Sequence, residues 1–358
     1  MLKVGFLTSG GDCQGLNGAM RGTVKALITN SKEKVQIYGF NYGYLGMINE
    51  DYRKMKPEDF EDILNMGGSI LGNSRCPFKQ IEKPDEQGRD KVKCMIETYK
   101  KLELDCLVVL GGNGSHKTAN LLSSKGLNVV TLPKTIDNDI YGTEVSFGFW
   151  SAIDIATRSI DELQTTAKSH KRIMIDEIMG HKTGWLTLHA GIAGNADVIL
   201  IPEIPYDIKE VRKAIDKKMK AGKDYIVIAA AEGIISKEDA KLSKKELKAK
   251  RAEDGFISAG YRLAAELAPH YTNEVRVVVP GHVQRGGNPD AFDRVLTSRL
   301  GTKAADLILN KEFGMAVAVV NNKITAIPLP QAVEKTKFVE PDDEFVIEAK
   351  KLGICLGD

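Results

Sequence analysis

The feature that most constrains the fold is a repeated alternation of short apolar runs with amphipathic segments. Each apolar run is rich in β-forming residues and ends in glycine or a polar turn; the runs cover residues 4–8, 35–40, 107–110, 129–132, 172–178, 198–201, 225–231 and 275–279. The segments between them include helical patterns such as 208–222. Short runs that are apolar throughout are typical of strands buried on both faces. Their alternation with helices predicts an α/β protein with mainly parallel sheets flanked by helices.

Length and charge exclude several classes of protein. The chain has 358 residues, and at about 150 residues per domain this indicates two or three domains. Lys and Arg number 50 against 48 Asp and Glu, so the formal net charge is only +2. This near balance argues against a nucleic-acid partner bound through a broad cationic face. The longest apolar stretches, such as 225–231, are far shorter than the roughly 20 residues that span a bilayer, so no membrane partner is expected.

The five cysteines are scattered, odd in number and never spaced C-x-x-C. A disulfide framework or a zinc site is therefore not expected, and a reducing cytoplasm fits this pattern. The segment 236–254 stands apart because it carries seven basic and five acidic residues and almost no large apolar ones. It is interpreted as a solvated helix or loop insertion, with a basic contact surface as the alternative.

Glycine-rich and charged loops follow the predicted strands. They read SGGD (9–12), GGNGS (111–115), PKTIDND (133–139), AEG (231–233) and PGHVQRGG (280–287). In open parallel sheets, ligands bind at the carboxyl ends of the strands. The five loops therefore predict one composite site. His116 and His189 lie outside these patterns, have no metal-ligand spacing, and are interpreted as structural or neutral.

Phosphate binding is the chemistry that these loops favour. Gly10 and Gly11 stand between a strand and a helix, where backbone N–H groups can approach an anion. Neither the dinucleotide fingerprint nor the Walker pattern is present, so a turn that only needs positive φ is the alternative. Downstream, His282 and Arg285 stand three residues apart just before paired glycines, with Arg276 upstream. The rigid fork of arginine suits phosphate or carboxylate groups.

Two carboxylates after the fourth apolar run suggest acid–base chemistry. Asp137 and Asp139 stand two residues apart, so one can take a hydroxyl proton while the other holds a cation. A helix-capping loop is the alternative, because Asp and Asn are also common in turns.

Taken in order, GGDxxGxN, LGNSR, GGNGS, PKTIDND, MG, AEG and HVQRGG resemble the phosphofructokinase family from about Leu2 to Ile308. The resemblance implies two similar α/β domains with the active site in the cleft between them. Residues 1–148 plus 284–334 would bind the phosphoryl donor, and 149–283 plus 335–358 the sugar phosphate. It also implies phosphorylation of the 1-hydroxyl of fructose 6-phosphate to fructose 1,6-bisphosphate in glycolysis, with ATP and Mg²⁺. A cytoplasmic homo-oligomer is expected, as a tetramer whose neighbouring subunit completes the site.

The resemblance also assigns residues. Asp137 would be the base and Asp139 would lie near Mg²⁺ and the transferred phosphoryl group, with Thr135 and Arg75 as further catalytic residues. The positions implied for the donor are Gly11, Tyr44, Arg75, Cys76, Gly112, Asn113, Gly114, Ser115 and Lys134. The positions implied for the sugar phosphate are Thr135, Asp137, Arg172, Met179, Gly180, His181, Glu232, Arg276, His282 and Arg285. Asn113 and Asp139 would hold the metal, and Arg172 and Arg276 would reach across the subunit interface.

Three departures from the family pattern keep alternatives open. Asn113 stands where the family usually has Asp, and His181 where it usually has Arg, which leaves room for a catalytically impaired sugar-phosphate sensor. The donor pattern is a hybrid, because Gly114 is typical of ATP-using members and Lys134 of pyrophosphate-using ones. We expect ATP, since Gly114 leaves space for a nucleotide whereas a flexible Lys134 can swing aside. A pyrophosphate-dependent phosphotransferase is the alternative.

Overall fold

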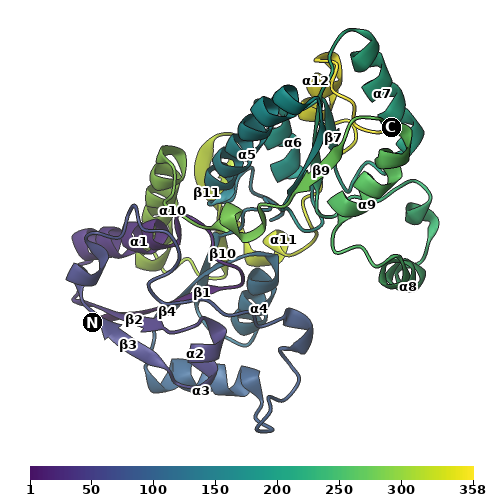
Figure 1. Cartoon of the computed structure of the whole chain (residues 1–358). Helices are drawn as coiled ribbons and strands as arrows, with labels where there is room; N and C mark the ends of the chain where they lie inside the picture. The colour runs from purple at the N-terminus through teal and green to yellow at the C-terminus, as the bar shows by residue number, and fades with distance from the viewer. The chain divides into compact units, whose positions relative to one another are not determined.

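The computed structural model describes all 358 residues, and the chain forms two compact units (Figure 1). Unit 1 comprises Met1–Ser151 and Arg285–Lys337, and unit 2 comprises Ala152–Gln284 and Phe338–Asp358. Both units contain runs from distant parts of the sequence, because the chain returns to unit 1 at Arg285 and to unit 2 at Phe338.

Unit 1 is built on a seven-stranded sheet with the order β11-β10-β5-β4-β1-β2-β3. Its strands are β1 (Leu2–Ser9), β2 (Val35–Phe40), β3 (Tyr52–Met55), β4 (Cys106–Gly111), β5 (Val129–Pro133), β10 (Met315–Val320) and β11 (Lys323–Pro328). The five central strands are parallel, and the two edge strands, β3 and β11, pair antiparallel. β1, β4 and β5 are neighbours, so the loops that follow them open at one edge of the sheet.

Helices cover both faces of this sheet (Figure 1). One face carries α1 (Leu16–Asn30) and α10 (Ala291–Leu309), and the other carries α2 (Tyr44–Ile48), α3 (Lys91–Lys101) and α4 (Asn113–Ser124), with the short α11 (Leu329–Ala332) beside α4. Two short 3-10 helices lie at Pro57–Phe60 and Phe78–Gln80. α1 and α10 approach closely through glycine, because a Cβ on Gly301 would lie 2.6 Å from the Thr23 nitrogen.

Unit 2 is built on a four-stranded parallel sheet with the order β7-β8-β6-β9. Its strands are β6 (Ile173–Ile178), β7 (Val198–Leu200), β8 (Ile226–Ala231) and β9 (Val275–Val278). The helices are α5 (Phe149–His170), which begins in unit 1, α6 (Trp185–Ala193), α7 (Ile208–Lys220), α8 (Lys244–Asp254), α9 (Ala259–Leu267) and α12 (Glu344–Lys351). Three 3-10 helices lie at Asp239–Lys241, Ala268–His270 and Gly281–Arg285. The predicted α/β class with mainly parallel sheets is confirmed.

The core of unit 2 follows from helical periodicity. Val211 and Ile215 on α7, and Leu263 and Leu267 on α9, are fully buried against strand residues such as Ile175. The lysine-rich segment behaves differently, because α8 has no buried residue and forms a solvated helix, as predicted. It begins with a capping box at Ser243 and ends at Gly255 in the left-handed conformation. None of the helices combines the length and the apolar character that a membrane span requires.

Candidate active site

Unit 1 brings the loops after β1, β4 and β5 into contact. The Lys134 ammonium, directly after β5, donates a hydrogen bond to the carbonyl oxygen of Gly11, which follows β1. Ser9 at the end of β1 pairs with Ser74 in an isolated parallel bridge, and the Gly10 N–H donates to the Ser74 carbonyl at 3.0 Å. Arg75, next along the chain, is exposed. The Lys134 N–H donates to the Gly111 carbonyl at the end of β4 at 3.0 Å, so three of the predicted loops meet at the carboxyl edge of the unit 1 sheet.

Gly11 makes room for a guanidinium group. A Cβ at this position would lie 3.1 Å from Nη1 of Arg285, whose Nη1 donates to the Asp12 carbonyl at 3.3 Å. The Nε of Arg285 is buried and has no hydrogen-bond partner. Such a donor is costly to leave unpaired, and an anion at this place would satisfy it.

The first turn of α4 offers a second set of donors. Gly112 is the N-cap, so Asn113, Gly114 and Ser115 carry N–H groups that have no partner within the helix and can face an anion. A Cβ built on Gly114 would meet nothing within 4 Å, which means that the space beside this turn is open. Tyr44 supports the turn from inside the protein, because its side chain is fully buried and its hydroxyl donates to the Ser115 carbonyl at 2.8 Å.

Cys76 and His116 contribute little reactivity. Cys76 is half-buried, and burial raises the pKa of its thiol. His116 is fully buried in α4 with its Nδ1 at 3.1 Å from the Gly112 carbonyl oxygen. Burial lowers the pKa of His116 to about 4, so the imidazole is neutral at pH 7, in agreement with its interpretation from the sequence.

The loop after β5 holds its two carboxylates in a fixed turn. The Asp137 N–H donates to the Thr135 hydroxyl at 3.0 Å, and Asn138 adopts a left-handed conformation with φ of 50°. The buried Asn138 amide accepts from the Ser146 N–H at 3.0 Å. Asp137 and Asp139 are both half-buried. Burial and the nearby Asp137 charge raise the pKa of Asp139 to about 6, so this carboxyl group favours a compensating cation.

The expectation that the Lys134 side chain is free to swing aside is wrong, because the side chain is buried and hydrogen-bonded. It is only 3% exposed, and burial lowers the pKa of its ammonium group. Its hydrogen bond to Gly11 places the ammonium charge among the loops that are predicted to bind the phosphoryl donor. The side chain is fixed because the Gly11 carbonyl, in the loop after β1, accepts a hydrogen bond from its terminal ammonium group.

Two of the predicted residues could hold Mg²⁺. No group of three or more His, Cys, Asp or Glu side chains in the structure could hold a metal by itself. Mg²⁺, however, usually binds through one or two protein oxygens together with water and substrate phosphates. The Oδ1 atom of Asn113 is buried and has no hydrogen-bond partner, and the Asp139 carboxylate is poorly solvated. This oxygen donor set fits Mg²⁺.

Unit 2 brings together part of the predicted sugar-phosphate set at the ends of β6 and β8, whereas Thr135, Asp137 and Arg285 lie in unit 1. The Oε1 of Glu232 accepts from the Gly180 N–H at 3.2 Å and from the His181 N–H at 2.7 Å. Gly180 has φ of 147°, and a Cβ there would lie 2.5 Å from the Thr183 carbonyl oxygen, so only glycine fits. His181 is exposed, and the Met179 N–H donates to Gln284 at 3.2 Å.

Glu274 is a residue that the sequence analysis missed. Its carboxylate pairs with both Arg172, at 2.6 Å from Nε, and Arg276. The predicted arginine pair is therefore brought together at the edge strand β9, in which Arg276 lies exposed. His282 is also exposed, within the 3-10 helix Gly281–Arg285. Glu274 precedes β9 and belongs to no motif, so its spacing carried no signal.

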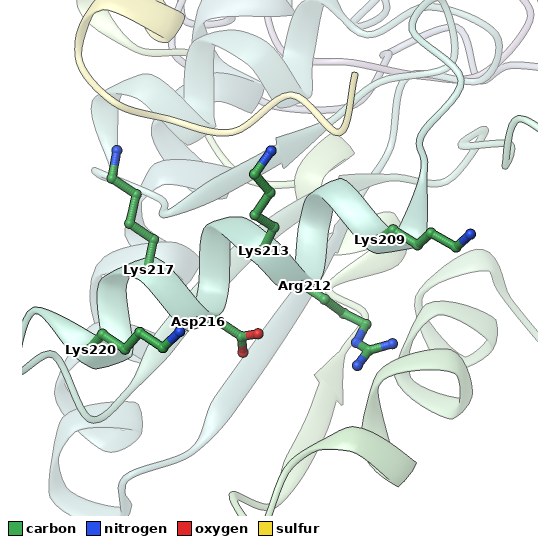
Figure 2. A pocket seen from close by; sticks show the side chains of 6 residues that line it. All are labelled: Lys209, Arg212, Lys213, Asp216, Lys217 and Lys220. Carbon is green, nitrogen blue, oxygen red and sulfur yellow. The ribbon is translucent and has the colours of Figure 1, made fainter.

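A further charged surface lies on α7, outside the predicted residues. A hollow of about 580 Å³ is lined by Lys209, Arg212, Lys213, Asp216, Lys217 and Lys220 (Figure 2). All six belong to one helix, and Lys213 pairs with Glu210 at 3.2 Å. This surface is the solvated face of an amphipathic helix whose other face packs in the core.

The fold and the loops after β1, β4 and β5 define an α/β protein of the class that binds phosphorylated ligands at the carboxyl ends of parallel strands. The sequence model described as Phosphofructokinase matches residues 3–308, and the chain belongs to the phosphofructokinase family. A relative named ATP-dependent 6-phosphofructokinase, from Spirochaeta thermophila, is 50% identical over 99% of this chain and 97% of its own length. A relative named pyrophosphate–fructose 6-phosphate 1-phosphotransferase, from Amycolatopsis methanolica, is 39% identical over 95% of this chain and 97% of its own.

Solved structures of related proteins agree with the fold. Phosphofructokinase from Pichia pastoris in the T-state superposes with a TM-score of 0.77 at 29% identity. The match covers 93% of this chain but 35% of the Pichia chain, so this chain spans about a third of that protein. The pyrophosphate-dependent phosphofructokinase from Marinobacter aquaeolei gives a TM-score of 0.81 over 97% of this chain and 88% of its own. At 19% identity, that likeness concerns the fold alone.

Proposed function

We propose that this protein is an ATP-dependent 6-phosphofructokinase. It transfers the terminal phosphoryl group of ATP to the 1-hydroxyl of fructose 6-phosphate in glycolysis, with Mg²⁺, in the cytoplasm. The observation that carries the proposal is the meeting of three loops in unit 1, where a buried unpaired Nε of Arg285 lies near Gly11, and the carboxylates of Asp137 and Asp139 lie on the loop whose Lys134 contacts Gly11. The named relative from Spirochaeta thermophila supports it.

Asp137 is the general base in this proposal. Phosphoryl transfer depends on positioning and electrostatic stabilisation more than on covalent chemistry. The bond from its backbone N–H to Thr135 and the left-handed turn at Asn138 fix the loop that aims the carboxylate. Asp137 takes the proton of the sugar hydroxyl as that oxygen attacks the terminal phosphorus of ATP, and the bond from this phosphorus to the bridging oxygen breaks, so that ADP leaves.

Donor phosphates are held by the N–H groups at the start of α4 and by Lys134. Asn113 and Asp139 would hold Mg²⁺, which when bound neutralises phosphate charge. Arg75 and Cys76 follow Ser74, which is bonded to Gly10, and are proposed as further donor contacts, together with Gly112 and Ser115 at the start of α4. The open space beside Gly114 supports a nucleotide as the donor.

The sugar phosphate is proposed to bind the residues that the family resemblance implies for it. The residues proposed to contact it are Met179, Gly180, His181, Glu232, His282 and Arg285. The Glu232 carboxylate is already fixed by two backbone N–H groups. Arg172 and Arg276 are proposed to act on the sugar phosphate of a neighbouring subunit in a homotetramer. An active monomer in a sizing measurement would contradict that role.

A coupled assay run in parallel with ATP and with pyrophosphate tests the function. We expect formation of fructose 1,6-bisphosphate with ATP and Mg²⁺, and loss of activity when a chelator removes the metal. Turnover with pyrophosphate alone would favour the alternative donor, for which the fixed Lys134 is the supporting observation. Tight binding of fructose 6-phosphate without turnover would favour a sensor, for which Asn113 and His181 are the supporting substitutions.

A further inference from the structure

Residues 336 and 337 lie against the loop that carries Asp137 and Asp139. Thr336 forms an isolated antiparallel bridge with Ile140, and the Lys337 N–H donates to the Asp139 carbonyl at 2.9 Å. Both residues belong to unit 1 and lie beyond residue 308, where the family match ends. They take part in none of the motifs that identify the site.

The side chain of Lys337 contacts the far end of the same loop. Its Nζ donates to the carbonyl oxygens of Thr143 and Glu144, each at 2.9 Å. Hydrogen bonds from an ammonium group are roughly twice as strong as those between neutral groups. One residue therefore holds the loop at Asp139 with its backbone and at 143–144 with its side chain.

The far end of the loop is itself fixed to the sheet. The Glu144 N–H donates to the Val319 carbonyl at 2.9 Å, and the Val319 N–H donates to the Thr143 hydroxyl at 2.9 Å. Val319 lies in β10, a strand in the interior of the unit 1 sheet. Lys337 thus connects the loop of the carboxylates to a rigid element.

The same short segment also reaches the start of α4. The Asn113 amide nitrogen donates to the Thr336 hydroxyl at 3.3 Å, which leaves the buried Oδ1 of Asn113 without a partner within the protein. Residues 336 and 337 consequently contact both predicted metal-binding residues, one through a side chain and the other through its carbonyl group.

We propose that Lys337 is a positioning residue for phosphoryl transfer. It holds the loop of Asp137 and Asp139 in the conformation in which these carboxylates act on the substrate. The inference rests on the proposed function, and Lys337 itself is not assigned a contact with the reacting atoms. Its effect should therefore fall on the chemical step rather than on binding, because a displacement of about 1 Å can lower a rate by about 10²-fold.

Three variants test this role. Lys337→Met removes the ammonium donor at nearly constant volume, Lys337→Arg keeps a donor that can reach two carbonyls, and Lys323→Met removes an exposed lysine of β11 as a control. For Lys337→Met we expect kcat to fall about 10- to 100-fold, with KM for ATP and fructose 6-phosphate changed less than about twofold. Lys337→Arg should recover most of the loss. A Lys337→Met enzyme with unchanged kcat, or an arginine variant as impaired as the methionine variant, would overturn the proposal.

Hydrogen exchange gives a readout that does not depend on activity. Amides in peptides covering 134–148 should exchange faster in Lys337→Met than in the wild type or in Lys323→Met. Equal exchange in all three proteins would overturn the inference, whatever the enzyme does. An inactive wild type whose Lys337→Met variant still shows faster exchange would instead count against the proposed function alone.

Discussion

The Lys134 ammonium donates a hydrogen bond to the backbone carbonyl of Gly11, and this links the loop after β5 to the loop after β1. The lysine is almost completely buried, so its charge is part of the donor site rather than a mobile group at its edge. A fixed lysine cation suits the phosphates of either donor, whereas the open space at Gly114 suits a donor that extends beyond its phosphates. Donor choice is therefore expected to depend on Gly114.

Gly114→Asp should strongly impair use of ATP. The carboxylate would stand in the first turn of α4, where it occupies the open space and competes with a phosphate for the helix N–H groups. We expect kcat/KM for ATP to fall at least about 100-fold, equivalent to about 2.7 kcal/mol. Gly114→Ala is the matched control, because its Cβ would meet nothing within 4 Å, and it should retain ATP activity. Survival of ATP turnover in the aspartate variant would refute the steric argument.

Asp137→Asn should separate binding from catalysis. The amide keeps the size of the side chain but is a poor base, so kcat should fall by the factor of about 10² to 10⁴ that is typical of general-base catalysis. Calorimetry should still detect binding of fructose 6-phosphate with similar affinity. Asp154→Asn, on the exposed face of α5, should behave as the wild type. Full activity in Asp137→Asn would show that Asp137 is not the general base.

His181→Arg should strengthen binding of fructose 6-phosphate. The His181 backbone is already held by Glu232, so the substitution changes the charge of an exposed side chain without moving its anchor. A permanent guanidinium should lower KM for the sugar phosphate about threefold or more, since an exposed ion pair contributes up to about 1 kcal/mol. His270→Arg, an exposed histidine in the short helix Ala268–His270, is the control. Unchanged kinetics would mean that His181 does not face the phosphate.

The strands of the two sheet interiors could largely be predicted because burial on both faces makes them apolar throughout, as in β4 and β8. The interior strand β10 was nevertheless missed, although it reads MAVAVV, whereas the edge strands β7 and β9 of unit 2 were predicted. The two edge strands of unit 1 were missed because they are more polar and more exposed. β3 reads YRKM and is half exposed, and β11 is exposed or half-buried along its length. A usable signal for the β10–β11 hairpin was Asn321-Asn322, which both adopt positive φ, since Asn tolerates the left-handed conformation that tight hairpin turns require.

The residues of the candidate site also fall into those that the sequence could predict and those that it could not. Contiguous motifs could be recognised because each loop keeps its own residues together, as at Thr135 and Asp137. Lys337 and Glu274 could not, because they act through backbone carbonyls or through arginines that belong to other segments. The orientation of the Lys134 side chain could not be predicted from the sequence either, because its hydrogen-bond acceptor, Gly11, is more than 100 residues away along the chain. Such contacts are set by which strands become neighbours.

A buried carboxyl group in unit 2 should make the stability of the protein depend on pH. Asp176 lies in β6 with its side chain inaccessible to solvent, and burial raises its pKa from 3.8 to about 7. Between these two values the folded protein keeps a proton that the unfolded chain has lost. Stability is therefore lost as pH rises from about 4 to about 7, and little further change comes from this group at higher pH.

Asp176→Asn removes this titration while keeping the shape of the side chain. At pH 8 the variant should unfold at a temperature higher than the wild type by on the order of a few degrees, and the difference should shrink toward pH 4. Asp306→Asn, exposed on α10, should show the wild-type dependence on pH. Thermal unfolding followed by circular dichroism at intervals between pH 4 and pH 8 provides the measurement. A difference between Asp176→Asn and the wild type that stays constant with pH would mean that Asp176 is not the group that titrates, because only a proton held by the folded state changes stability in this direction.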